Sequence, residues 1–397
     1  MAPRAPRAPL IHSLPHEGRR RVAPTRGGRR NNALANRPGL RPFPGQICYA
    51  KVMSNTSWHT GIPPADWDEH QTDLSAHFLQ GRGWALFQQA LGKKLYYAAG
   101  THWSWIAIHE TNRFGSRLYT PYGPTASSPA SLAKALAALV ECANDLDVDF
   151  VRIEPQAPGA KKVLRQLHAK HAHRDMQPKN TLIKDLNRPD DELLAEMMST
   201  NRRLFRRAAA AGFTFKQSHD PADVALFLDM IHQVAARTGI QPLPDEYFTT
   251  MAKTLFPLKA ASLFIAEHNG TPVSTSIILE DAHTRYYAHA ASAESARKLQ
   301  PSVYLVGHMI FDAKSQGKQH FDYYGVAPPH ASRTHKWAGF SQFKRSFGGR
   351  EVEYVGTWEI PIRRTRYQAY RLFTNLQSVK STSKKLARTT VKRLTRH

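Results

Sequence analysis

The chain has 397 residues, 41% of them hydrophobic, which is enough for a buried core and for two domains. Its formal net charge of +24 lies mainly at the ends of the chain. Residues 1–52 carry eleven Lys and Arg and one acid, and residues 361–397 carry eleven Lys and Arg and no acid. A charge of +3 therefore remains for residues 53–360. Two distant cysteines, Cys48 and Cys142, exclude a disulfide framework, and no apolar run reaches the ~20 residues of a membrane span. We therefore expect a reduced, cytoplasmic protein.

Residues 1–52 are rich in Arg, Pro and Gly and show almost no apolar periodicity, so we expect them to be disordered. One interpretation is a basic arm that binds nucleic acid. The other is that Met53 is the natural start and that the upstream residues are an annotation artefact. We favour the second interpretation, because ordinary globular composition begins abruptly near Met53.

The next 130 residues predict an α/β lobe. Apolar spacing indicates a helix over 77–92, and a Ser start with an apolar stripe indicates another over 128–146. Alternation and turn residues predict strands at 94–100, 103–110, 116–123 and 149–155.

A similar order returns later in the chain. Asn269-Gly270 predicts a hairpin between strands, followed by a strand at 285–292, a helix at 302–317 and a strand at 320–326. The simplest account is α/β (α+β) architecture with two alike lobes in tandem. We expect the first lobe at 54–183, the second at 184–355 and a C-terminal return at 356–397.

Three more helices are expected outside this repeat. One covers 190–212 and ends at Gly212, one covers 225–239, and an amphipathic helix covers 367–380. The first carries Arg202, Arg203, Arg206 and Arg207, which are i,i+4 neighbours in two pairs. A solvated charged face and a phosphate-binding surface both fit this pattern.

The segment WAGFSQFKRSFGG (337–349) combines aromatic residues, cations and two glycines. It fits a basic hairpin with a lysine that reaches solvent, or a loop that handles an anion. In the second case Trp337 and Phe343 would cover the stem of Lys344 and lower the dielectric around its amine. Motifs of zinc hydrolases, serine hydrolases and P-loop enzymes do not occur in the sequence.

The segment KWAGFSQFKRSFGGREVEYVGTWE resembles the closing segment of the Fem family, whose members are non-ribosomal peptidyltransferases that use aminoacyl-tRNA to build peptidoglycan branches. Similar pieces occur in the family's order at 78–92, 122–136, 149–155, 238–248 and 321–326. The resemblance covers roughly 65–360. It implies two GNAT-like lobes in tandem, with the chain returning to the first lobe. No stretch has the length for the helical-hairpin arm of some relatives.

The resemblance also implies an activity, which is transfer of an amino acid from its tRNA ester to an amine on the stem peptide of a peptidoglycan precursor, either lipid II or UDP-MurNAc-pentapeptide. Such an ester is already activated, so no cofactor or metal is required beyond aminoacyl-tRNA as co-substrate. The family pattern places Lys344, beside Phe343, as the cation that stabilises an oxyanion or a phosphate. It places Glu154 near the acceptor amine and Tyr247 at the acceptor site. Alternatively, Glu154 pairs with Arg152, and Tyr247 packs on Phe248.

The sequence departs from the family at several positions. Relatives that bind a UDP-linked precursor have basic residues near the positions of Gln88 and Leu243, which are not basic here. A lipid-linked precursor, or a phosphate grip by Arg202 and Arg206, would replace that clamp. His289 stands where relatives often have tyrosine, and it fits a substrate contact or an inward histidine bonded to a neighbour.

Two rival functions belong to other classes. An acyl-CoA-dependent N-acyltransferase would share the fold, but the segments after residues 122 and 292 lack the glycine-rich pyrophosphate loop. A non-enzymatic nucleic-acid-binding protein would need charge on its core, which is nearly neutral. The basic tail 381–397 could instead rest on anionic lipid at the inner face of the membrane.

Overall fold

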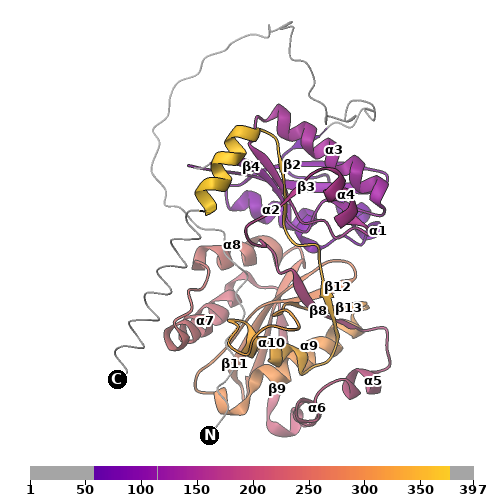
Figure 1. Cartoon of the computed structure of the whole chain (residues 1–397). Helices are drawn as coiled ribbons and strands as arrows, with labels where there is room; N and C mark the ends of the chain where they lie inside the picture. The colour runs from indigo at the N-terminus through magenta and orange to yellow at the C-terminus, as the bar shows by residue number, and fades with distance from the viewer. Residues whose placement is uncertain (1–57, 114, 376–397) are drawn as a thin grey trace, which may run out of the picture.

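Two stacked lobes, each built on a mixed β-sheet, make up the chain (Figure 1). The computed structural model describes residues 58–113 and 115–375. The expectations for 1–52 and for the tail 381–397 therefore lie outside the described residues. Within those residues no helix is long and apolar enough to cross a membrane.

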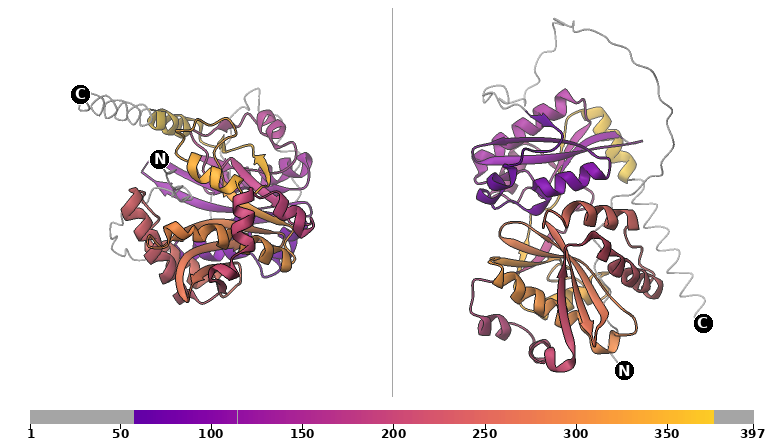
Figure 2. Two further views of the ribbon diagram at one scale, coloured as in Figure 1. Left: turned by 90° about the horizontal axis from the view of Figure 1, so that it is seen from below. Right: turned by 180° about the vertical axis from the view of Figure 1, so that it is seen from behind.

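The first lobe has the strand order β1-β2-β3-β4-β6-β15-β7, with β5 paired to β3. Helices α3 and α4 pack together against this sheet (Figure 2). The elements of its first part are β1 (His59–Thr60), α1 (Trp67–Asp73), η2 (Phe78–Gln80), α2 (Arg82–Ala90), β2 (Lys94–Gly100), β3 (Trp103–Asn112), β4 (Gly115–Thr120), β5 (Thr125–Ala126), α3 (Pro129–Asp145), β6 (Phe150–Ile153), α4 (Ala160–Gln166) and β7 (Lys170–His171).

The second lobe has the strand order β14-β8-β13-β12-β11-β10-β9. Helix α9 packs on one face of this sheet and α7 on the other. Its elements are β8 (Asn180–Asp185), α5 (Asp190–Ala195), α6 (Ser199–Arg206), η3 (Ala209–Ala211), β9 (Phe213–Ser218), η4 (Pro221–Asp223), α7 (Val224–Thr238), α8 (Asp245–Leu255), β10 (Ala261–His268), β11 (Thr271–Glu280), β12 (Thr284–Ser292), η5 (Arg297–Leu299), α9 (Pro301–Ser315), β13 (His320–Gly325), α10 (Ala338–Arg345) and β14 (Arg350–Glu353).

The repeat expected from the sequence is present in both lobes. Each has an antiparallel meander, a crossover helix and a strand parallel to the last meander strand: β4, α3 and β6 in the first lobe, and β12, α9 and β13 in the second. This confirms the predicted class of two α/β lobes in tandem. The longest helix in 58–375 is α3 with 17 residues, so that range holds no long helical-hairpin arm.

Three expectations about helices were wrong. The helix predicted over 77–92 is divided at Gly81, whose extended backbone separates η2 from α2. The helix predicted over 190–212 consists of α5, α6 and η3, because the backbone of Met198 is extended before α6 begins. The segment 337–349 is neither a hairpin nor a loop throughout, since residues 338–345 form α10.

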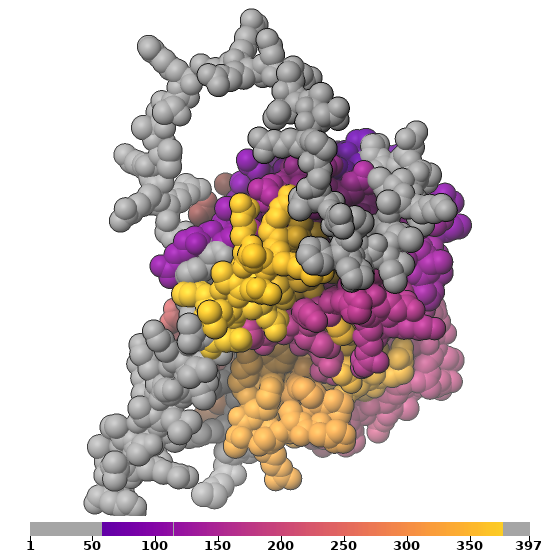
Figure 3. Space-filling view, turned by 45° about the horizontal axis from the view of Figure 1, so that its top comes forward, coloured from indigo at the N-terminus to yellow at the C-terminus, as the bar shows by residue number. Residues whose placement is uncertain are grey.

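The chain returns to the first lobe through β15 (Trp358–Pro361), which pairs with β6 and β7. A helix follows over 364–375, and it overlaps the expected helix at 367–380 as far as the structure is described. In Figure 3 this yellow segment lies against the purple first lobe. The buried Arg152 of β6 forms an ion pair of 2.6 Å with the buried Glu359 of β15, which joins the return strand to the lobe.

Candidate functional site

The second lobe has a notch where two parallel strands stop pairing. Strands β12 and β13 pair at three positions, the last of which joins Tyr286 to Asp322. Against its other neighbour, β8, strand β13 shifts register between Asp322 and Gly325, and Tyr324 has a φ of +60°. The C-terminal parts of β12 and β13 are therefore not joined by backbone hydrogen bonds to each other.

The first lobe has no such notch at the matching place. Strands β4 and β6 pair as far as Thr120 and Ile153, and the amide of Glu154 then donates to the carbonyl of Gly123 at 2.8 Å. Backbone hydrogen bonds thus continue past the ends of both strands. The two lobes share their topology but differ in backbone pairing at the ends of their parallel strands.

Lys344 fills the notch of the second lobe. Its side chain enters from α10 and is 1% exposed, and its Nζ donates to the carbonyl oxygen of Gly325 at 2.8 Å. The same nitrogen lies 5.1 Å from the ring centre of Phe340 and 6.0 Å from that of Tyr287 on β12. A single amine therefore lies between the diverging ends of β12 and β13.

Burial controls the protonation of this amine. Desolvation lowers the pKa of Lys344 to about 7, against the attraction of Asp322, which acts in the opposite direction. Near neutral pH the side chain is thus divided between amine and ammonium forms. It can present a positive charge or accept a proton without a large free-energy cost.

Asp322 is the acidic partner that sequence reasoning missed. It is 3% exposed on β13, and its Oδ1 accepts from the hydroxyl of Thr181 and from the amide of Tyr324 at 2.6 Å. Burial raises its pKa to about 6. One signal was present in the sequence: an acid inside the apolar, aromatic strand FDYYGV, where a buried acid needs partners.

Glu154 lies in the first lobe and is 3% exposed. Its carboxylate accepts from the hydroxyl of Tyr119 at 2.7 Å, from the hydroxyl of Thr357 and from three backbone amides, those of Tyr122, Met176 and Gln177. The alternative pairing with Arg152 is wrong, because Arg152 pairs with Glu359. Burial raises the pKa of Glu154 despite these hydrogen bonds.

A hydrogen-bonded chain connects Glu154 to the notch in the other lobe. Tyr119, which donates to Glu154, accepts from the Nε2 of Gln177 at 3.1 Å. The hydroxyl of Tyr324 donates to the Oε1 of the same Gln177 at 3.1 Å, and the amide of Tyr324 donates to Asp322. Gln177 therefore bridges a carboxylate of the first lobe and a carboxylate of the second.

Tyr247 and His289 lie together beside the α7–α8 core. Tyr247, on the first turn of α8, packs its ring 5.1 Å from Phe87 of the first lobe and 5.5 Å from Phe248. The ring of His289 on β12 is 6.4 Å from that of Tyr247. Burial lowers the pKa of His289 to about 3, and its buried Nε2 has no partner within 58–113 and 115–375. The alternative of a histidine bonded to a neighbour is therefore not what the structure shows.

The remaining candidates lie around α10 and α6. The ring of the half-buried Trp337 is 5.6 Å from that of Phe340, and Phe343 packs 5.2 Å from Phe347. Helix α6 begins beside the end of α10, since Asn201 donates to the hydroxyl of Ser346 at 2.6 Å.

Two of the three arginines of α6, Arg202 and Arg206, differ in exposure. The half-buried Arg202 donates to the carbonyl of Ala195 at 3.3 Å, and Arg206 is exposed. Arg206 has no ion pair with a described residue. Among the described residues no cluster of His, Cys, Asp and Glu could hold a metal ion.

Comparisons with known proteins agree with this architecture. Residues 195–344, a range that contains β12, β13 and Lys344, match the family model described as "Acetyltransferase (GNAT) domain". The crystal structure of FemX superposes with a TM-score of 0.68 at 17% identity, over 76% of this chain and 97% of that one. The L-PGS of Bacillus licheniformis and the C-terminal domain of a putative lysylphosphatidylglycerol synthetase from Agrobacterium fabrum each reach a TM-score of 0.50 at 13% identity, over 79% of this chain and 98% and 96% of theirs. No curated protein sequence matches significantly. The tandem GNAT fold expected from the sequence is confirmed.

Proposed function

We propose that this protein is an aminoacyltransferase of the Fem type, which moves an amino acid from aminoacyl-tRNA to an amine of the stem peptide of a peptidoglycan precursor. The observation that supports this most is the buried amine of Lys344 in the notch between β12 and β13. In a CoA-dependent enzyme that space would receive the acyl donor, and a glycine-rich loop before the helix would hold its pyrophosphate. Here the segment between β12 and α9, residues 293–300, contains no glycine. Similarity to the fold of FemX supports the same proposal.

The proposed reaction needs few catalytic groups. The acceptor nitrogen bonds to the ester carbonyl carbon, the bond from that carbon to the ribose oxygen breaks, and the amine's proton ends on the released hydroxyl. A cation beside the reacting carbonyl stabilises the developing oxyanion, or it holds a phosphate of the donor. Lys344 supplies that cation, and Phe343 and Trp337 cover the α10 side of the site.

Glu154 has a positioning role in this proposal. Its carboxylate already accepts five hydrogen bonds from the protein, so it has little capacity left to deprotonate an amine. Through Tyr119 and Gln177 it holds Tyr324 and thereby Asp322 in place. Tyr247 and His289 would contact the acceptor from the other side of β12.

The acceptor we expect is the lipid-linked precursor rather than the UDP-linked one. Gln88 and Leu243, at the positions where UDP-binding relatives carry basic residues, have no positive charge and are buried, so they give no cationic clamp. Arg202 and Arg206 are two of the three arginines of α6, a helix that begins next to the end of α10, and we propose that they contact phosphates of a substrate. Arg206→Ala should raise KM for one of the two substrates with kcat unchanged, and an unchanged KM for both would remove Arg206 from the site. Contact with the inner face of the membrane would be peripheral.

One observation favours a second candidate, an acyl-CoA-dependent N-acyltransferase. The match of residues 195–344 is to an acetyltransferase domain. A single experiment separates the two candidates. The purified chain is incubated with a labelled aminoacyl-tRNA pool and either lipid II or UDP-MurNAc-pentapeptide, beside acetyl-CoA with the same acceptors. We expect label on the stem peptide, with more label transferred when lipid II is the acceptor than when UDP-MurNAc-pentapeptide is. Acetyl transfer alone would overturn the proposal.

A further inference from the structure

The two glycines that follow α10 have no role in the proposed reaction, and close packing accounts for both of them. Gly348 has a φ of +79° and Gly349 a φ of +113°, which are backbone conformations that favour glycine. A Cβ atom on Gly348 would lie 2.6 Å from the Cβ of Glu196, and one on Gly349 would lie 2.9 Å from the carbonyl oxygen of Ile183. The chain that leaves α10 therefore crosses directly over the end of α5 and over β8.

A fully buried lysine lies next to this crossing. Lys184 on β8 has a side chain with 0% exposure, and its Nζ donates to the Oε2 of Glu196 at 2.6 Å and to the carbonyl oxygen of Phe347 at 3.1 Å. Burial lowers the pKa of Lys184, although the bonded carboxylate of Glu196 acts in the opposite direction. Since no part of this side chain reaches solvent, its ammonium group acts on the protein itself and not on a ligand.

The same stretch of chain is held at a second point. The carbonyl oxygen of Ser346 accepts from the amide of Met198 at 2.9 Å, and the hydroxyl of Ser346 accepts from the Nδ2 of Asn201 at 2.6 Å. These contacts and the bond from Lys184 fix the two residues that come directly after α10.

The position of this turn decides where Lys344 lies. Helix α10 has eight residues, and a helix of that length depends on tertiary contacts for its place because it is not stable alone. Lys344 belongs to its last turn, three residues before Phe347. The Nζ of Lys344 lies 2.8 Å from the carbonyl oxygen of Gly325, so a shift of the helix end by about 1 Å would break this bond.

Stability alone does not account for a lysine at position 184. Replacement of a buried ion pair by well-packed apolar side chains of similar volume is often neutral or stabilising. Leu182, two residues earlier on the same face of β8, is buried in the apolar cluster that also contains Phe347. An apolar side chain at 184 would continue this cluster. What the lysine adds is a donor directed at the carbonyl oxygen of Phe347.

We propose that Lys184 is a positioning residue for Lys344. By bonding to the carbonyl oxygen of Phe347 and to Glu196, it fixes the end of α10 and thereby keeps the amine of Lys344 in the notch between β12 and β13. Gly348 serves the same purpose, because it allows the chain to approach Glu196. The effect on transfer rests on the proposed function, whereas the position of the amine does not.

The test follows the protonation of Lys344 in the full chain by NMR. Lysine that is isotope-labelled at Cε is incorporated, and the Lys344 signal is the one that is absent from Lys344→Met. In the wild-type chain it should titrate near pH 7, since burial lowers the pKa of Lys344 to about 7 against the attraction of Asp322. In Lys184→Met it should titrate at a pH that is higher by about 1 or more, because an amine displaced from the notch becomes hydrated. A wild-type signal that titrates near pH 10.5 would overturn the proposal.

Gly348→Ala separates position from charge. It removes no charge but brings a Cβ atom against Glu196, so it should raise the pH at which Lys344 titrates, as Lys184→Met does. If the Lys344 signal titrates at the wild-type pH in Gly348→Ala, a rise in Lys184→Met comes from the lost positive charge alone, and the proposal is overturned.

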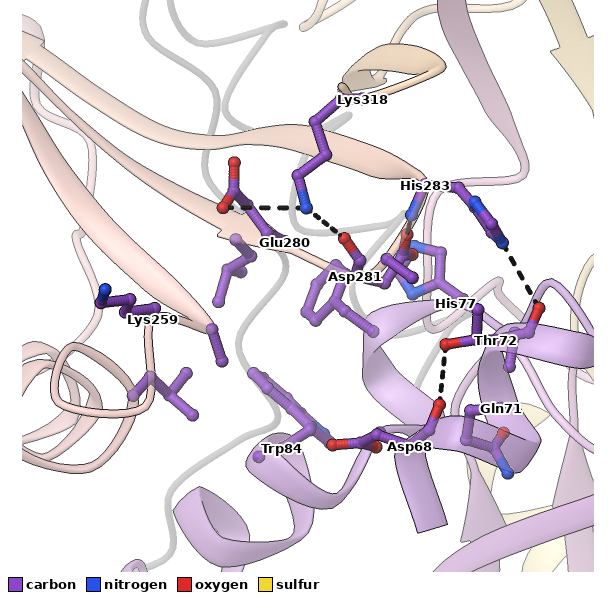
Figure 4. Close-up of a pocket in the computed structure, with 18 residues that line it drawn as sticks. Asp68, Gln71, Thr72, His77, Trp84, Lys259, Glu280, Asp281, His283 and Lys318 are labelled. Atoms are coloured by element: carbon purple, nitrogen blue, oxygen red, sulfur yellow. Dashed lines mark hydrogen bonds and ion pairs between the residues drawn. The ribbon is translucent and has the colours of Figure 1, made fainter. Parts of the chain in front are cut away.

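Lys318→Met is the matched control. Figure 4 shows Lys318 at the cavity between the lobes, directed at Glu280 and Asp281. Its Nζ donates to the carbonyl oxygen of Asp281 at 2.5 Å and lies 4.0 Å from Glu280, so it resembles Lys184 in having a carbonyl and a carboxylate partner, but both partners lie outside α10. Lys318→Met should leave the titration of Lys344 unchanged, and a rise equal to that in Lys184→Met would overturn the proposal.

The transfer assay gives a second readout. Lys184→Met and Gly348→Ala should each lower kcat by about tenfold or more, with KM for the tRNA donor changed less than about twofold, since a small displacement of a catalytic group lowers the rate. Lys184→Met should remain folded, because Glu196 keeps its ion pair with Arg188. A loss of thermal stability with an unchanged Lys344 titration and an unchanged kcat would give Lys184 a structural role and overturn the proposal. If the wild-type chain transfers no aminoacyl group, the proposed function fails, whereas the titration still decides the position of the amine.

Discussion

The Nζ of Lys344 lies 2.8 Å from the carbonyl oxygen of Gly325, at the point where β13 ends. Asp322 attracts this amine without forming an ion pair with it, and the Oδ1 of Asp322 accepts instead from Thr181 and from the amide of Tyr324. The amine therefore has one neutral acceptor and keeps further donor capacity. This arrangement fits a cation that is held ready for a substrate.

Replacement of Lys344 should separate activity from stability. Lys344→Met should lower kcat/KM for aminoacyl transfer by about 10²–10³-fold, the loss seen when a group that stabilises an oxyanion is removed. The fold should be retained, since methionine fills much of the same volume and Asp322 keeps its hydrogen bonds from Thr181 and from the amide of Tyr324. Transfer kinetics and thermal unfolding of the same preparation measure both effects.

Lys298→Met is the matched control for this variant. Lys298 is exposed on η5 and lies outside the notch, so its replacement should leave kcat/KM within a factor of two. Wild-type turnover in Lys344→Met would remove Lys344 from the reaction, whatever the control shows.

The buried lysine should also leave a signature in the pH dependence of stability. Its pKa is about 7 in the folded chain and 10.5 as the ordinary value, so between these values the unfolded chain binds more protons. The free energy of unfolding should thus rise with pH across this window, by up to about 1.4 kcal/mol per pH unit from this group. Denaturant titrations at pH 7.5, 8.25 and 9 should show a shallower rise in Lys344→Met, and equal slopes would contradict the burial argument. Asp322, with a pKa of about 6, changes charge mainly below this window.

The return strand predicts a stability effect in the first lobe. Glu359→Gln would leave Arg152 buried without its carboxylate, so we expect a loss of about 3–5 kcal/mol in the free energy of unfolding. The double variant Arg152→Met with Glu359→Met should recover part of this loss, because no unpaired charge remains. Denaturant unfolding of the wild-type chain and of these two variants measures both changes.

An exposed ion pair in the same segment gives the comparison. Asp147 lies 2.6 Å from Arg363, and both side chains are well exposed. Asp147→Asn should therefore lower the free energy of unfolding far less than Glu359→Gln does, because solvent screens an exposed pair. An equal loss in Asp147→Asn and Glu359→Gln would show that burial is not the cause.

Much of the fold could be predicted because local patterns agree with the tertiary structure. The strand expected at 94–100 is β2, and the Ser start of the helix expected at 128–146 is the N-cap Ser128 of α3. The helix over 190–212 failed because its composition is helical throughout, while the break at Met198 depends on a contact with the distant Ser346. Local propensity contains no information on such a contact.

The candidate site was harder to predict than the fold. The motif predicted Lys344 as a site residue, but it did not predict the carbonyl partner or the helix that carries Lys344. Asp322 was missed because a single acid in an apolar strand gives no periodic signal, and its partner Thr181 lies 141 residues away. The bridge from Glu154 to Tyr324 through Gln177 joins the two lobes, so it depends on how they pack rather than on any one segment.

That bridge gives a final prediction. Glu154→Gln keeps the size of the side chain but converts charge-assisted hydrogen bonds into neutral ones and places an amide donor opposite donors. We expect a loss of about 1–3 kcal/mol in the free energy of unfolding. If Glu154 positions Tyr324 and Asp322, kcat should also fall, by about tenfold, with KM for the donor unchanged. Gln177→Leu should lower kcat to the same extent, because it breaks the bridge at another point. Glu69→Gln, at an exposed carboxylate of α1, is the control and should change neither quantity. A fall in stability with an unchanged kcat in both bridge variants would restrict Glu154 to holding the first lobe together.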